Sequence, residues 1–158
     1  MDLERTPRRQ VRLKDIMRPA VSVAPDTSAR AVLKILIENR IPGVPVVDAE
    51  EHLRGFISDG HLLAAALPKY MARMKDLSFV GEGTDSWVRY LAESADRPVS
   101  EMMSAEVSQV ERSRSEVAVA HKMVHDGASS VMVTEEGKLV GIVNRLDLCA
   151  AVVGNEAD

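Results

Sequence analysis

The sequence predicts a mixed α/β (α+β) fold, in which two pseudo-symmetric β-α-β-β-α repeats pack sheet to sheet with a helical insert between them. The chain has 158 residues, enough for one domain or two small ones. Hydrophobic residues make up 46% and charged residues 28%, as in an average soluble domain. Two further observations carry the prediction: an internal repeat, and the same order of strand and helix patterns in each copy.

The repeat relates four segments of the first half to four of the second half. The offset is 86 or 87 residues throughout, as from Lys14 to Ser100 and from Gly43 to Ser130. Chance similarity would seldom keep one offset through four segments. The paired segments are KDIM (14–17) with SEMM (100–103), VS (21–22) with VS (107–108), GVPVV (43–47) with SVMVT (130–134), and LRGFIS (53–58) with LVGIVN (139–144).

The first repeat opens with a short strand at 21–23. A Pro-Asp-Thr-Ser turn follows, and its last residue, Ser28, is the expected N-cap of a helix over 29–39. Four apolar residues of this helix recur at helical spacing and predict its buried face. They are Val32, Leu33, Leu36 and Ile37.

Two strands and a helix complete each repeat. The β-branched run at 43–47 predicts a buried strand, a second strand is expected at 55–58, and a helix begins at 61 and ends at 67. The second repeat shows the same order. It predicts strands at 107–110, 130–133 and 139–143, and helices at 115–125 and 146–153.

A connection of about 30 residues separates the repeats, far longer than the ordinary loop of roughly 4–6 residues. We therefore divide the chain into repeat one at 11–67, an insert at 68–98 and repeat two at 99–154. Apolar residues at helical spacing predict two short helices around Gly81-Glu82-Gly83. Four of the five aromatic residues lie in the insert, where they either cover an edge of the core or contact a dimer partner.

Composition argues against several classes of function. The net charge of -4 and the 3% aromatic content do not favour nucleic-acid binding. A single cysteine, Cys149, excludes an intrachain disulfide, and His121 with His125 share a helix face without a third metal ligand. No apolar run approaches membrane-spanning length and the N-terminus lacks a signal-peptide pattern, so we expect a cytoplasmic protein without a membrane partner.

The doubled motifs resemble the cystathionine-β-synthase (CBS) domain family, arranged as a tandem pair. The resemblance rests on DIM (15–17), VSVAPDTS (21–28) and IPGVPVVD (41–48) in repeat one. In repeat two it rests on GIVNRLD (141–147), which is similar to the family's Gly-hydrophobic-hydrophobic-Ser/Thr-x-x-Asp signature. It implies a regulatory module that requires no cofactor and is not an enzyme. Its ligands would be AMP, ADP, ATP or S-adenosylmethionine, bound in clefts between the repeats. It also implies a homodimer, and a stand-alone pair would act in trans on an unknown protein effector.

The resemblance places Asp147 where the family's aspartate binds the ribose hydroxyls. An ionised carboxylate accepts hydrogen bonds from both hydroxyls of a diol. The alternative is that Asp147 only caps its helix. Asn144 stands where the family has Ser or Thr, and it keeps both donor and acceptor capacity. Arg145, in the same turn, either reaches a phosphate or is a solvated surface arginine.

The resemblance assigns the adenine end of this cleft to small apolar groups of the other repeat. On this chain they are Ala20, Ile41 and Pro42, with Asp15 and Arg18 nearby. Such groups suit a purine, as in most small-molecule pockets. The alternative is ordinary core packing.

The pseudo-symmetric cleft would use Ser58 and His61 with Ala105, Ala128 and Ser129. His61 stands at the aspartate position, and a neutral imidazole has one acceptor, so it binds a diol less well than a carboxylate. This cleft is expected to be weaker, empty or suited to another ligand.

Two observations bear on the choice of function. Some nucleotide-sensing members have a basic pair before the hydrophobic-Pro-Val strand, and here Pro42-Gly43 and Ser129-Ser130 stand there, so a less charged adenosine ligand is as plausible as ATP. His61 and Asn144 support a second hypothesis, a structural or dimerising CBS module that binds no nucleotide. An enzyme is not favoured, because the sequence has no Gly-x-Ser-x-Gly, phosphate loop or clustered His, Asp and Glu set.

Overall fold

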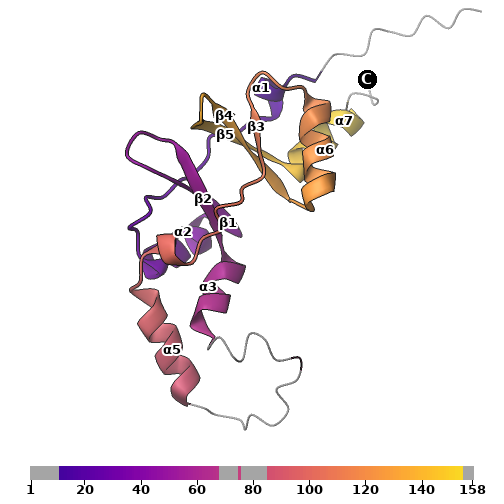
Figure 1. The fold of residues 1–158 in the computed structure, drawn as a ribbon. Helices are drawn as coiled ribbons and strands as arrows, with labels where there is room; N and C mark the ends of the chain where they lie inside the picture. The colour runs from indigo at the N-terminus through magenta and orange to yellow at the C-terminus, as the bar shows by residue number, and fades with distance from the viewer. Residues whose placement is uncertain (1–10, 68–74, 76–84, 155–158) are drawn as a thin grey trace, which may run out of the picture. The chain divides into compact units, whose positions relative to one another are not determined.

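The structure, a computed structural model, describes residues 11–67, 75 and 85–154, which fall into two compact units (Figure 1). Unit 1 combines the segment before Val21 with the chain from Val107 onward. Unit 2 runs from Val21 to Glu106. Each unit mixes short strands with helices, which confirms the predicted α/β (α+β) class.

Unit 2 is built around a two-stranded antiparallel sheet of β1 and β2, with Gly43 paired to Ser58 and Val46 to Gly55. Helix α2 precedes the sheet and α3 follows it directly. The elements are α2 (Ala29–Asn39), β1 (Gly43–Val47), β2 (Leu53–Ser58), α3 (Asp59–Ala66), α5 (Asp85–Ala95) and a 3₁₀ turn (Val99–Glu101).

Unit 1 contains a three-stranded sheet in the order β3-β4-β5. Strands β3 and β4 are parallel, whereas β4 and β5 form an antiparallel hairpin. The elements are α1 (Leu13–Ile16), β3 (Gln109–Glu111), α6 (Glu116–Asp126), β4 (Ser130–Glu135), β5 (Lys138–Asn144) and α7 (Arg145–Gly154).

Helices α2 and α6 begin in the same way. The hydroxyl oxygen of Ser28 accepts from the backbone N–H of Ala31 at 3.2 Å, and that of Ser115 accepts from Ala118 at 3.3 Å. A serine in this position satisfies one of the first-turn N–H groups that have no partner within the helix. The two caps are 87 residues apart and fix the equivalence of the repeats at this point.

The predicted apolar face of α2 is half right. Val32 and Leu36 are buried, whereas Leu33 and Ile37 are 46% and 67% exposed. Successive residues of a helix are turned by about 100°, so residues 33 and 37 form a row beside the one that enters the core. Val32 and Leu36 belong to the hydrophobic core of unit 2, whereas Leu33 and Ile37 do not.

The strand expected at 21–23 is wrong in its extent, because only Val23 pairs, in a single parallel bridge with Val46. The next bond of a parallel ladder on either side would need a backbone N–H from Pro25 or from Pro45, and proline has none. At the equivalent positions of unit 1, Arg112 N–H donates to Thr134 and Met132 N–H donates to Ser108, both at 2.8 Å. There the ladder continues as β3.

The core of each unit includes residues from the segment that opens the other repeat in sequence. Leu13 and Ile16 of α1 are buried in the core of unit 1, and Val99 is buried in the core of unit 2. The other buried core residues of unit 1 are Val119, Met123, Val131, Val133, Val143 and Leu148. Those of unit 2 are Val23, Val32, Leu36, Val44, Val46 and Ile57.

The described part of the insert contains one helix, α5, which packs against α3 and α2 in unit 2 (Figure 1). Arg30 of α2 donates to Asp96, just after α5, at 3.3 Å. Val88, Tyr90 and Leu91 of α5 remain at least 41% exposed. The first of the two expected helices and the Gly81-Glu82-Gly83 turn lie outside the described residues. Within those residues, no helix is both long and apolar enough to cross a membrane.

Candidate functional site in unit 1

A carboxylate and a guanidinium meet in unit 1 where β5 ends and α7 begins. Asp147 is the third residue of α7, and its side chain is only 23% exposed. Arg18 Nη2 donates to Asp147 Oδ1 at 2.7 Å, and Arg18 Nε lies 2.7 Å from Oδ2. This two-point pairing is the strong geometry for an arginine and a carboxylate, and it fixes the orientation of both groups.

Arg18 is held there by its backbone. Its N–H donates to the carbonyl of Ile142 at 2.8 Å, and its carbonyl accepts from the Ile142 N–H at 2.9 Å. Gly141, next to Ile142, makes this approach possible, because a Cβ at that position would lie 3.0 Å from the Arg18 carbonyl oxygen and 2.6 Å from Met17 Sδ. The segment before Val21 thus brings a cation to the start of α7.

Asn144 and Arg145 flank the pair. Asn144 Nδ2 lies 3.5 Å from Asp147 Oδ2, so it is a weak third donor to the carboxylate. A carboxylate has about four acceptor positions, and Arg18 with Asn144 uses three of them. Both hydroxyls of a diol can therefore bind only if one present donor moves. The side chain of Arg145 is exposed, while its backbone N–H donates to the Ser129 carbonyl at 2.9 Å.

The equivalent groups of unit 2 form a helix cap. Ser58 Oγ accepts from the His61 N–H at 3.2 Å, and His61 Nδ1 accepts from the Ser58 N–H at 3.0 Å. This reciprocal arrangement is a capping box at the start of α3. Because Nδ1 accepts, Nε2 carries the proton in the neutral ring, and the acceptor of the imidazole is already used.

The predicted site residues divide between the units. Unit 2 holds Ile41, Pro42, Ser58 and His61, and there the Pro42 carbonyl accepts from the Asp59 N–H at 2.8 Å. The Asp59–Pro42 bond matches the Arg145–Ser129 bond of unit 1. Unit 1 holds Ala20, Ala128, Ser129, Asn144, Arg145 and Asp147.

Sequence reasoning placed Arg18 only near the adenine end and did not anticipate its pairing with Asp147. The repeat contained a signal. Arg18 corresponds to Ser104 at the offset of 86, and Ser104 makes the equivalent backbone bridge, to Phe56 of β2. A long cation at the position of a small serine points to a role for the side chain.

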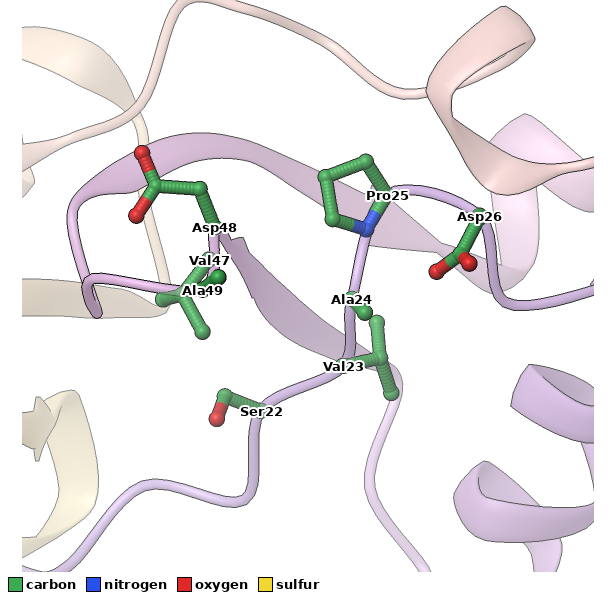
Figure 2. Close-up of a pocket in the computed structure, with 8 residues that line it drawn as sticks. All are labelled: Ser22, Val23, Ala24, Pro25, Asp26, Val47, Asp48 and Ala49. Atoms are coloured by element: carbon green, nitrogen blue, oxygen red, sulfur yellow. The ribbon is translucent and has the colours of Figure 1, made fainter.

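A hollow of about 520 Å³ lies in unit 2 between the segment 22–26 and the end of β1 (Figure 2). Asp26 and Asp48 stand at its two sides, and none of the predicted site residues lines it. Partial loss of solvent raises the pKa of Asp48. Hydrogen bonds from the His52 backbone, from Arg54 and from the Glu50 backbone lower the pKa by more than this, so the net pKa lies below its ordinary value. Asp48 is engaged in the turn between β1 and β2.

The two histidines of α6 stack with ring centroids 6.0 Å apart. His125 Nδ1 lies 3.0 Å from Asp126 Oδ1, and Ser108 Oγ donates to Asp126 Oδ2 at 2.7 Å. Hydrogen bonds from His125, Ser108 and Lys122 lower the pKa of Asp126 to about 2. Within the described residues, no group of three His, Cys, Asp or Glu side chains is arranged to hold a metal ion.

Comparisons with known proteins agree with this architecture. Among curated proteins, "CBS domain-containing protein CBSX1, chloroplastic" of Arabidopsis thaliana is 29% identical over 138 residues, which are 83% of this chain. The chain spans only 58% of the length of that relative.

Solved structures share the fold. The Arabidopsis thaliana CBS-pair protein CBSX2 matches with a TM-score of 0.73 and 21% identity, over 95% of this chain and 99% of that chain. CBSX2 in complex with AMP matches with a TM-score of 0.68 and 23% identity, over 90% and 96%. The CBS domain of a membrane protein from Sphaerobacter thermophilus matches with 0.69 and 28%, over 91% and 89%.

The family model of the CBS domain matches residues 13–68 and residues 99–154. Both matches begin with the segment that crosses to the other unit, which explains why the repeats in sequence and the units in space have different boundaries. With two such matches covering most of its length, the chain belongs to the CBS domain family and carries a tandem pair of its domains.

Proposed function

We propose that the chain is a regulatory CBS pair that binds an adenosine-containing ligand, such as AMP, ADP, ATP or S-adenosylmethionine, with Asp147 as the acceptor for the ribose hydroxyls. The observation that carries the proposal is the mostly buried Asp147 carboxylate at the start of α7, held in a fixed orientation by Arg18. A helix start also favours a negative charge. The AMP complex of the structurally similar CBSX2 supports this ligand class.

The pairing with Arg18 gives the site a defined change on binding. When the ribose hydroxyls take the carboxylate, the Arg18 guanidinium is released and becomes a donor for a phosphate of the same ligand. Arg145, whose side chain is exposed beside it, is a second such donor. We propose Ala20, Ile41 and Pro42 as the contacts of the base, on the strength of the family resemblance.

For the first-repeat residues Ser58 and His61 we propose a structural role. Their capping box uses the Ser58 hydroxyl oxygen and the His61 Nδ1 acceptor without a ligand. The chain would then bind ligand through one of its two pseudo-symmetric sites.

We also propose that the pair acts as a homodimer. Large apolar side chains remain exposed on two helices of unit 1, namely Val117 and Val124 of α6 and Leu146 and Val153 of α7. Val124 is 85% exposed and Leu146 is 82% exposed. Apolar side chains gathered on a surface are typical of protein–protein contacts.

Ligand titration of Asp147→Asn tests the proposal. Adenosine, AMP, ADP, ATP, NAD and S-adenosylmethionine are titrated by calorimetry into the wild type, into Asp147→Asn and into the matched control Asp96→Asn, whose carboxylate is exposed in unit 2. We expect at least one ligand to bind the wild type and the control equally. Asp147→Asn should weaken it by about tenfold or more, because a charged acceptor is lost.

Two results would contradict the proposal. If the wild type binds none of these ligands, the adenosine class is wrong. If Asp147→Asn binds as tightly as Asp96→Asn, Asp147 does not hold the ribose. The melting temperature of each variant without ligand shows whether it is folded, so that a loss of fold is not mistaken for a loss of site.

A further inference from the structure

A second hollow, of about 410 Å³, lies in unit 1 between the segment that contains α1 and the loop before α6. Four basic residues line it: Arg12 and Lys14 from the segment, and Arg112 and Arg114 from the loop. Glu116 is the one acidic residue among its lining residues, so four positive charges face one negative charge. In a chain of net charge -4, this is a local excess of positive charge.

The basic side chains of this hollow have few partners among the residues that the structure describes. Arg112 Nη1 lies 3.4 Å from Glu135 Oε2, and both side chains are about half exposed, so the pair is weak. Arg12, Lys14 and Arg114 form no ion pair with another described residue. Like charges this close repel one another, and an anion between them relieves the repulsion.

The same place in unit 2 is closed by backbone hydrogen bonds. The Val99 N–H donates to the Thr27 carbonyl at 2.9 Å, and the Ser100 N–H donates to the Pro25 carbonyl at 3.0 Å. Residues 99 and 100 are thus joined to the loop before α2 by two neighbouring backbone hydrogen bonds.

The open form in unit 1 coincides with a change of residues at the same repeat position. At the offset of 87 that relates the two capping serines, Pro25 and Thr27 correspond to Arg112 and Arg114. Within the described part of unit 1, no backbone hydrogen bond joins the segment 11–17 to the loop 112–116. Where unit 2 has backbone hydrogen bonds, unit 1 has a hollow. Basic residues line this hollow from both the segment 11–17 and the loop 112–116.

We propose that this hollow binds a small phosphate-bearing anion. Arginine guanidinium groups donate in pairs to phosphate oxygens, and the volume lies in the range of ordinary small-ligand pockets. No aromatic ring lines it, so it lacks the aromatic platform on which single-stranded nucleic acid stacks. The site shares no residue with Arg18, Asn144 and Asp147, and it is independent of the function proposed for them.

Titration with inorganic pyrophosphate tests this site in the full chain. Calorimetry at fixed ionic strength compares the wild type with Arg114→Gln, Lys14→Gln and the control Lys34→Gln, which removes one exposed charge from α2 in unit 2. We expect Arg114→Gln and Lys14→Gln each to weaken pyrophosphate binding by about tenfold, because each removes a charged donor. The Lys34→Gln variant should bind pyrophosphate as the wild type does. Arg114→Gln should bind adenosine, which carries no phosphate, as the wild type does, and this separates the site from the adenosine site.

Three results would overturn the inference. One is the absence of saturable pyrophosphate binding up to about 10 mM. Another is an equal loss of affinity in Arg114→Gln and Lys34→Gln, since that would show attraction by general charge alone. The third is tighter binding of a short single-stranded oligonucleotide than of pyrophosphate, with the same loss in Arg114→Gln, which would assign the surface to nucleic acid. Circular dichroism of each variant confirms that these exposed substitutions leave the fold intact.

Discussion

Replacing Gly141 with alanine tests how the N-terminal segment is attached to unit 1. The added Cβ would lie 2.6 Å from Met17 Sδ and 3.0 Å from the Arg18 carbonyl oxygen. The Cγ atom of Met17 would lie nearer still, so this side chain must change its rotamer. The carbonyl has less freedom, because it accepts a hydrogen bond from the Ile142 N–H at 2.9 Å. The segment must therefore move outward by a few tenths of an ångström, or part of its bridge to β5 must open.

The magnitude follows from these contacts. Overpacking of this kind costs about 1–3 kcal/mol, and each backbone bond lost from the bridge adds about 0.5–1.5 kcal/mol. In a chain of this length, about 1 kcal/mol lowers the melting temperature by about 2–4 °C. We expect Gly141→Ala to melt about 2–12 °C below the wild type if the bridge is kept, and up to about 18 °C below it if one backbone bond is lost, in a thermal scan followed by circular dichroism. The NMR signal of the Arg18 side-chain N–H should shift, because Arg18 moves away from its carboxylate partner.

Gly154→Ala is the matched control. A Cβ at Gly154 meets no atom within 4 Å, and alanine is favoured over glycine in a helix. This variant should be as stable as the wild type or slightly more stable. The reasoning is refuted if Gly141→Ala melts within about 1 °C of Gly154→Ala and leaves the Arg18 signal unchanged.

Two further predictions concern charges in unit 1. Arg18→Ala frees the Asp147 carboxylate from an ion pair worth about 0.2–1 kcal/mol, so calorimetry should show adenosine binding up to about fivefold tighter. The preference for AMP over adenosine should fall about tenfold, and an unchanged preference would contradict the phosphate role of Arg18. Asp126 has its pKa lowered from 3.8 to about 2, so it stabilises the fold fully above pH 3.8 and loses this effect as the pH falls through 2. Urea unfolding of Asp126→Asn should therefore differ from the wild type at pH 5 and approach it near pH 2; a constant difference would argue against the lowered pKa.

Local pattern was enough to place most elements. The helix at 29–39 and the strand at 43–47 have the predicted bounds, because the Ser28 cap and the turn residues that mark their ends act locally. The strand at 21–23 failed because the prediction considered one strand at a time. Pairing depends on the N–H groups of both strands, and Pro45 lies in the partner.

The candidate site shows the limit of such reasoning more clearly. Asp147 and Asn144 are three residues apart at a strand-to-helix junction, so a short motif contains them both. Arg18 is 129 residues from Asp147 and reaches it only because the segment before Val21 packs on unit 1. Periodicity and turn signals report neighbours along the chain, and they carry no record of which repeat a connecting segment packs against.

The crossed segments also set an order for folding. Unit 2 lies wholly between residues 21 and 106, whereas the first strand bridge of unit 1 joins Arg18 to Ile142. During synthesis, α1 leaves the ribosome before unit 2, whereas the sheet that buries Leu13 and Ile16 emerges after unit 2. Unit 2 can close while α1 is still exposed, and unit 1 then forms from the segments on either side of it. The entropy cost of closing a loop grows only with the logarithm of its length. Closing the loop between Arg18 and Ile142 therefore costs less than about 1 kcal/mol more than closing the loop between Phe56 and Ser104. Loss of residues 1–20 would therefore damage the core of unit 1 and leave unit 2 with its core complete.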